Sequence, residues 1–123
     1  ADHLDVIAEC IDTGAAVAYT DESVNGELRR AASYTQASHL ARPTLLHHLV
    51  VADTALAREV ARDLPRGHYW PEMMLFWEMA KRGGAAYVPR VGYRWNKRAS
   101  GLHREWFTVL GMHNSRRWCA ENL

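Results

Sequence analysis

Apolar positions recur along this chain at two spacings, which predict alternating helices and strands. Between residues 2 and 13, apolar side chains fall on one side of a helix, as in an amphipathic segment. These side chains are Leu4, Ile7, Ala8 and Ile11. Residues 15–20, AAVAYT, form a continuous apolar run typical of a strand buried on both faces. The dipeptide Asn25-Gly26 then predicts a tight turn.

The middle of the chain has a weaker pattern. Residues 27–34 favour an exposed strand, residues 35–42 a loop and residues 43–47 a helical turn. Residues 49–52 predict a second buried strand. Asp53 or Thr54 can cap a helix that continues to about residue 61. Its inward side chains are expected to be Leu56, Val60 and Ala61.

The clearest pattern lies between residues 69 and 96. Pro71 suits a first helical turn, and Gly83-Gly84 predicts the end of that helix. Its apolar stripe consists of Met74, Leu75, Trp77 and Met79. Residues 85–88 and 91–95 are β-prone runs separated by Pro89, so we expect two strands.

Residues 103–122 predict a final helix whose apolar face is mixed. The side chains on that face are Trp106, Leu110, Met112 and Trp118. Helices and strands therefore alternate along the chain, a pattern that indicates the α/β class.

Composition and charge narrow the function classes. A chain of 123 residues fits one domain, and its net charge of +1 gives no argument for a nucleic-acid partner. A DNA-binding C-terminal helix using Arg104, Arg116 and Arg117 is thus a weak alternative. Cys10 and Cys119 favour two reduced thiols in a cytoplasmic protein. No apolar run is long enough for a transmembrane helix, and the abrupt start at Ala1 suggests a piece cut from a longer protein.

Three segments in order resemble family 2 glycosyltransferases, which have the GT-A fold. They are AAVAYTDESVNG, LLHHLVVADTALAREV and WPEMMLFWEMAKRGGAAYVPRVGYRWN. The similarity runs from about Asp2 to His103. It implies that residues 1–102 are the acceptor-side half of a GT-A-like domain, with a mixed sheet flanked by helices, and that residues 103–123 are a C-terminal helical extension. The donor-binding half, with its D-x-D motif, would precede this chain.

The resemblance also implies a reaction. A sugar would pass with inversion from a nucleoside-diphosphate sugar to an acceptor hydroxyl, with a divalent metal, Mn or Mg, in the complete enzyme. Glu72 falls where the family has its catalytic base. Spacing alone favours the explanation that Glu72 is a helix-end residue interacting with the helix dipole, and the resemblance brings the two explanations level.

Other candidate residues would bind the substrates. Asp21 and Glu22 could contact sugar hydroxyls, although an Asx-type turn after a strand explains Asp21 as well. Trp70, beside Glu72, could be a platform for the acceptor, whereas Trp77 belongs to the core by its helical spacing.

Cationic residues follow the last predicted strand. Arg94, Arg98 and His103 could contact the diphosphate, and His103 could also bind the metal, although a solvated linker explains them equally. His47-His48 would point to opposite faces of a strand, which favours one buried and one exposed histidine over a metal site.

A non-catalytic interaction module is the alternative function. Pro71 and Met74 stand where the glycosyltransferase family carries acids next to its base. Their presence favours a small α/β domain that has kept the shape of the family and lost its chemistry.

Overall fold

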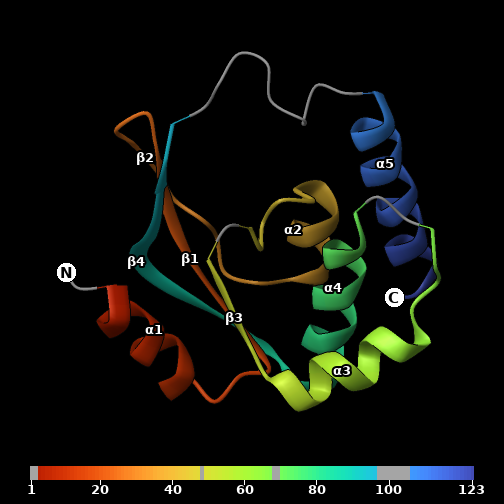
Figure 1. Ribbon diagram of the computed structural model, residues 1–123, viewed down its shortest axis with the longest axis horizontal. Helices are drawn as coiled ribbons and strands as arrows, with labels where there is room; N and C mark the ends of the chain where they lie inside the picture. Colours follow the sequence, from red (N-terminus) through yellow and green to blue (C-terminus); the bar gives the residue numbers. More distant parts are fainter. Residues whose placement is uncertain (1–2, 48, 68–69, 97–105) are drawn as a thin grey trace.

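The fold is a mixed β-sheet with helices on both faces, as the α/β prediction required (Figure 1). The computed structural model describes residues 3–47, 49–67, 70–96 and 106–123. In chain order the elements are α1 (His3–Asp12), β1 (Val17–Val24), β2 (Glu27–Arg29), α2 (Gln36–Ala41), β3 (Val50–Ala52), α3 (Thr54–Asp63), α4 (Pro71–Gly83), β4 (Ala85–Trp95) and α5 (Trp106–Glu121).

Strand β1 lies at the centre of the sheet. Along one edge it pairs in parallel with β4, from Val17 opposite Ala85 to Val24 opposite Trp95. Its other edge is shared, because β3 pairs antiparallel with residues 17–19 and β2 pairs antiparallel with residues 22–24. The run predicted at residues 15–20 is therefore the first part of a longer strand, which is buried except at Glu22 and Ser23.

The tight turn predicted at Asn25-Gly26 is confirmed. Asn25 and Gly26 both have positive φ, 51° and 82°, the combination that closes a two-residue hairpin between β1 and β2. The predicted exposed strand after the turn is shorter than expected, because only Glu27–Arg29 pairs with β1.

Helix α1 covers one face of the sheet, but not with the predicted side chains. Val6 and Cys10 are buried, and Cys10 packs against Ala18 of β1. Leu4 and Ile11 instead point to solvent, with 69% and 63% of their surfaces exposed. The predicted apolar side of the helix exists, but it faces outward.

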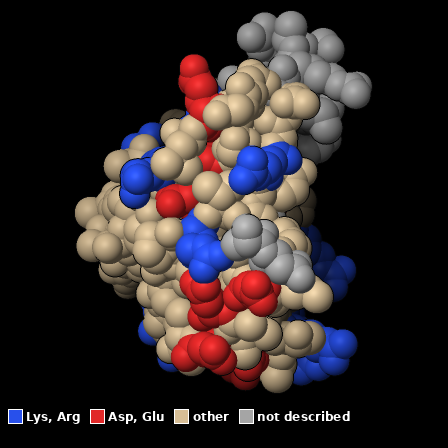
Figure 2. Space-filling model, turned by 90° about the vertical axis from the view of Figure 1, so that its left-hand side faces the viewer, with Lys and Arg blue, Asp and Glu red and all other residues tan. Residues whose placement is uncertain are grey.

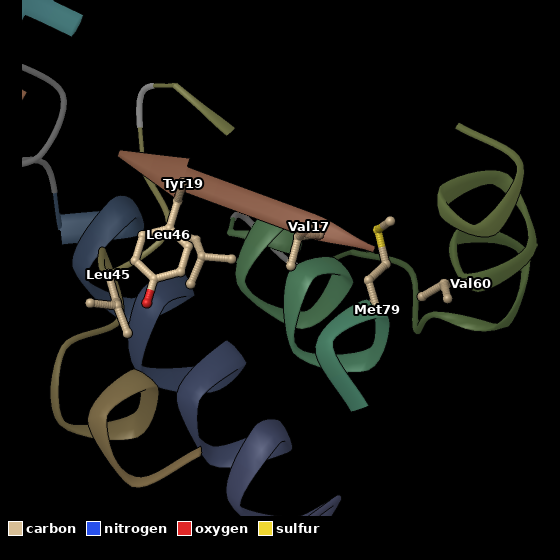
Figure 3. Packing of buried hydrophobic residues seen from close by; sticks show 6 residues of the cluster. All are labelled: Val17, Tyr19, Leu45, Leu46, Val60 and Met79. Carbon is tan, nitrogen blue, oxygen red and sulfur yellow. The ribbon is translucent and has the colours of Figure 1, made fainter. Parts of the chain in front are cut away.

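The opposite face of the sheet carries the main core. Val17 and Tyr19 project from β1 toward the helices, where they meet Leu45, Val60 and Met79 (Figure 3). Alternate β1 residues point to the other face, as the pleat requires. The inward position of Val60 is confirmed, whereas Ala61 is exposed and was placed wrongly.

Helix α4 matches its prediction closely. It begins at Pro71 and ends at Gly83, and Gly84 with φ 81° donates its N–H to the carbonyl of Ala80. Its buried side chains are Met73, Met74, Trp77 and Met79, so Trp77 is a core residue as expected.

Three elements differ from the prediction. Residues 36–41 form helix α2 rather than a loop, capped reciprocally by Thr35 and Ser38. Residues 43–47 form a turn without helix. The two strands expected around Pro89 are one strand, β4. A register shift leaves Pro89 and Arg90 without partners on β1. Because Pro89 lies at this shift, its lack of a backbone N–H removes no hydrogen bond between the strands.

Helix α5 packs on α4 mainly through small side chains. From residue 108 onward its buried positions are Thr108, Gly111, Ser115 and Cys119. Of the predicted large side chains, Trp118 is half-buried against the cluster around Trp77, and that of Trp106 lies outside the described part of the chain. Leu110, expected inside, is 49% exposed. The indole Nε1 of Trp77 donates to the carbonyl of Asn122 at 3.0 Å, so the C-terminal helix shares the core of the preceding residues.

Two further expectations concern the thiols and the membrane. Cys10 and Cys119 are free and buried, and burial raises the pKa of Cys119 to about 12, so both are protonated packing residues. Within the described residues, no helix combines the length and apolar character needed to cross a bilayer.

Candidate functional site

The predicted acids and aromatics gather toward one end of the sheet. β1 and β4 are parallel, and α4 runs back against them, so the first turn of α4 lies toward the end where both strands finish (Figure 1). In open α/β sheets, ligands bind outside the carboxyl ends of the strands. This end therefore holds the candidate site: Asp21 and Glu22 from β1, and Trp70 and Glu72 from the start of α4.

Asp21 is an internal anchor. It is 4% exposed, and its Oδ1 accepts hydrogen bonds from the backbone N–H of Ala31 and the hydroxyl of Tyr87, both at 2.7 Å. Burial, followed by these contacts with Asp21, raises the pKa of Tyr87. The side chain therefore ties the segment after β2 to the sheet, a longer-range role than the Asx-type turn considered from the sequence.

Two tyrosines support this anchor. Tyr87 stacks on Tyr19 with ring centroids 5.7 Å apart, and the hydroxyl of Tyr19 donates to the carbonyl of Ala32. Burial raises the pKa of Tyr19 to about 12, so its hydroxyl remains a donor at neutral pH. The segment from Ala31 to Ala32 is thus fixed over the carboxyl half of β1.

Glu22 is more accessible. One carboxylate oxygen accepts a hydrogen bond from the indole Nε1 of Trp95 at 3.1 Å. The same residue lines a small hollow with cationic and polar side chains. The hollow is bounded by Thr20, Glu22, Arg29, Ala31, Arg42, Thr44, Leu45 and His47, and its volume of about 10 Å³ matches one water molecule.

Trp70 is held from two sides. Its ring stacks on His47 with centroids 6.1 Å apart and planes inclined by 26°, and its carbonyl accepts a hydrogen bond from Ser115 at 2.9 Å. Through His47, Trp70 is connected to the hollow beside Glu22. His47 is half-buried, and its neighbour His48 lies outside the described residues.

Glu72 stands in the first turn of α4, behind the exposed Pro71. It is partly exposed, and its carboxylate makes no hydrogen bond or ion pair with the other described residues. A carboxylate at this place can accept a proton from a group that approaches the start of α4.

Arg94 is separated from this group. Trp95 points toward Glu22, so Arg94, the preceding residue of β4, points to the opposite face. There it is exposed beside a shallow groove of about 600 Å³, which it lines with His3, Arg90, Val91, Gly92 and Tyr93. Arg98 and His103 lie outside the described residues.

A buried histidine near this site was not predicted. His39 of α2 is fully buried between the rings of Tyr34 and Trp77, with its Nδ1 3.1 Å from the Tyr34 hydroxyl. Burial lowers the pKa of His39 to about 4, so the ring is neutral at pH 7. No periodic signal marks this position, because it belongs to a helix of only six residues.

Metal ligands are not assembled in the described part of the chain. Its His, Cys, Asp and Glu side chains form no group of three or more that could hold a metal ion. Comparisons with protein-family models, curated proteins and solved structures find no match to this sequence.

Proposed function

We propose that this chain supplies the acceptor side of an inverting glycosyltransferase active site. One observation carries the proposal: the acids of β1 and the Trp70–Glu72 start of α4 lie toward the same end of the sheet, with Trp70 linked to the Glu22 hollow by His47. Three segments of the sequence resemble family 2 glycosyltransferases in the same order, and this resemblance suggests glycosyl transfer as the reaction.

In the proposed reaction, the carboxylate of Glu72 removes the proton from the acceptor hydroxyl. The oxygen attacks the anomeric carbon of the donor sugar from the side opposite the nucleoside diphosphate, which departs with its bonding electrons. Trp70 offers an aromatic face to the acceptor sugar, and Glu22 offers a carboxylate to its hydroxyl groups. Asp21 takes no part in binding here, because both of its hydrogen bonds are internal.

The proposal assigns donor binding to a partner half of the cleft. The residues that the structure describes include no group of three or more side chains that could bind a metal ion, and Arg94 faces away from Glu22. We therefore derive no step through a metal from these residues. The chain alone is expected to bind acceptor sugars weakly and to transfer none.

Chemical-shift mapping tests this assignment on the chain itself. We expect mono- and disaccharides, titrated into isotope-labelled protein, to shift the amide signals of Trp70, Glu72 and Glu22. Signals from α3, which lies at the end where β1 and β4 begin (Figure 1), are the internal control and should stay unchanged. Uniform absence of shifts with a broad panel of sugars would contradict the proposed acceptor site, as would robust turnover of a nucleotide sugar by the chain alone.

A further inference from the structure

A groove with an apolar floor and a basic rim runs between α2 and α5. Leu40 and Ala120 provide the floor, and the exposed side chains of His113, Arg116 and Arg117 provide the rim. The groove has a volume of about 320 Å³. Arg117 is bonded within the helix to Glu121 at 3.2 Å, but both side chains are largely exposed, so this pair can exchange partners at little cost.

Exposed apolar side chains precede the groove along α5. Val109 precedes His113 by four residues and is 56% exposed, and Leu110 beside it is 49% exposed. Positions 109, 113, 116 and 120 repeat at helical spacing, so they form one stripe. The stripe begins with Val109, carries His113 and Arg116 in its middle and ends with Ala120, a surface suited to an acidic amphipathic helix.

Helix α1 carries a surface of this complementary kind. Leu4 and Ile11 project outward seven residues apart, with the exposed Ala8 between them. Asp5 and Asp12, each next to one of these apolar residues, are exposed as well. Figure 2, which views the molecule from the side of α1, shows acidic side chains gathered on this face.

The charges of the two surfaces are opposite. Asp5 and Asp12 of α1 can meet Arg116 and Arg117 of the rim. The apolar side chains of Leu4 and Ile11 can then contact the apolar floor.

These surfaces cannot meet within one molecule. Figure 1 shows α1 and α5 on opposite sides of the sheet. We propose that copies of this chain associate head to tail, with the outer face of α1 of one copy seated in the α2–α5 groove of the next. Such a contact uses two different surfaces, so it joins copies into closed rings or open chains.

The association is weak and depends on salt. A single helix in a shallow groove buries less area than a standard stable interface, which places the dissociation constant at about 100 μM or weaker. The aspartate–arginine pairs at its rim are solvent-exposed, so added salt weakens them.

Charge exchange between the surfaces tests the proposal. One variant carries Asp5→Lys and Asp12→Lys, and the other carries Arg116→Glu and Arg117→Glu. All four positions are exposed, so both variants are expected to fold, which circular dichroism checks. Sedimentation velocity from about 20 μM to 1 mM should show growing species for the wild type and at least about tenfold weaker association for each variant alone.

Mixing the two variants is the decisive step, because lysines on one α1 then face glutamates on the other groove. We expect the mixture to regain association at both contacts. Association that fails to return on mixing, or wild-type protein that stays monomeric throughout, would overturn the proposal. Salt-sensitive binding of monomeric wild type to phosphatidylserine vesicles would also overturn it, by assigning the basic rim to a membrane surface.

Discussion

Asp21 and Glu72, two carboxylates of the candidate site, differ in their surroundings. Asp21 is buried, and its carboxylate accepts hydrogen bonds from Ala31 and Tyr87. It therefore holds neighbouring segments in place and does not face a ligand. Glu72 is partly exposed at a helix start and has no such internal duty within the described residues. Asp21 is therefore a structural residue and Glu72 is the candidate for contact with a ligand, although the sequence presents both as candidate acids.

His39 is the residue that should make stability depend on pH. Its folded pKa of about 4 lies below the usual 6.5, so the unfolded chain binds more protons between these values. The stabilisation is full above pH 6.5 and is lost as the pH falls toward 4. The slope due to His39 reaches at most about 1.4 kcal/mol per pH unit.

Urea unfolding at several pH values measures this slope. His39→Gln keeps a neutral polar side chain that does not titrate, so its stability should change less between pH 6.5 and 4.5 than that of the wild type. The replacement of an exposed histidine, His113→Gln, is the control and should leave the wild-type slope. Equal slopes for the wild type and His39→Gln would refute the buried, neutral state of His39.

At the scale of elements, the junction of α4 and β4 depends on a close approach. A Cβ built on Gly83 would lie 2.5 Å from the Cβ of Ala16, two atoms that cannot move away independently of the backbone. The amide of Ala16 also donates to the carbonyl of Gly83 at 2.9 Å. The end of α4 is thereby fixed to the start of β1.

We predict that Gly83→Ala destabilises the protein by about 1–3 kcal/mol, although alanine is the better helix former. Thermal or urea unfolding measures the loss. Adding Ala16→Gly removes the opposing methyl group and should recover a large part of it. If the double variant is no more stable than Gly83→Ala alone, the contact between these positions is not the cause.

The sequence predicted elements best where local chemistry sets them. Pro71, Gly84 and Asn25-Gly26 fix helix ends and a turn through their own backbone preferences, and the structure confirms each of them. The sequence predicted less well which side chains are buried, because tertiary packing determines that. From residue 108 onward the fully buried positions of α5 are small residues such as Gly111 and Ser115, which allow close contact with α4 and give no apolar periodicity.

The same limit applies to the site. The acids of β1 and the start of α4 could be predicted as candidates from their order along the chain. Their partners could not, because the stacking of His47 on Trp70 and the bond from Trp95 to Glu22 join residues that are far apart in sequence. Arg94 likewise points away from Glu22 because it precedes Trp95 in the strand β4, which is one continuous strand where the sequence favoured two.

For the whole molecule, two surfaces serve two separate proposals. The carboxyl end of the sheet carries the acids and the tryptophan assigned to glycosyl transfer, while α1 and the α2–α5 groove carry the contact between copies. The charge-exchange variants leave Trp70, Glu72 and Glu22 intact, so failure of one proposal leaves the other standing.

Replacement of Glu72 by glutamine in the complete gene product tests the central claim most directly. Glutamine keeps the size and polarity of the side chain but cannot accept the proton, so transfer to the acceptor should fall about 10²- to 10⁴-fold while donor binding is retained. Glu121→Gln, an exposed change on α5, should leave transfer unchanged. If Glu72→Gln transfers sugar at the wild-type rate, Glu72 is only a helix-end residue and the proposed mechanism is wrong.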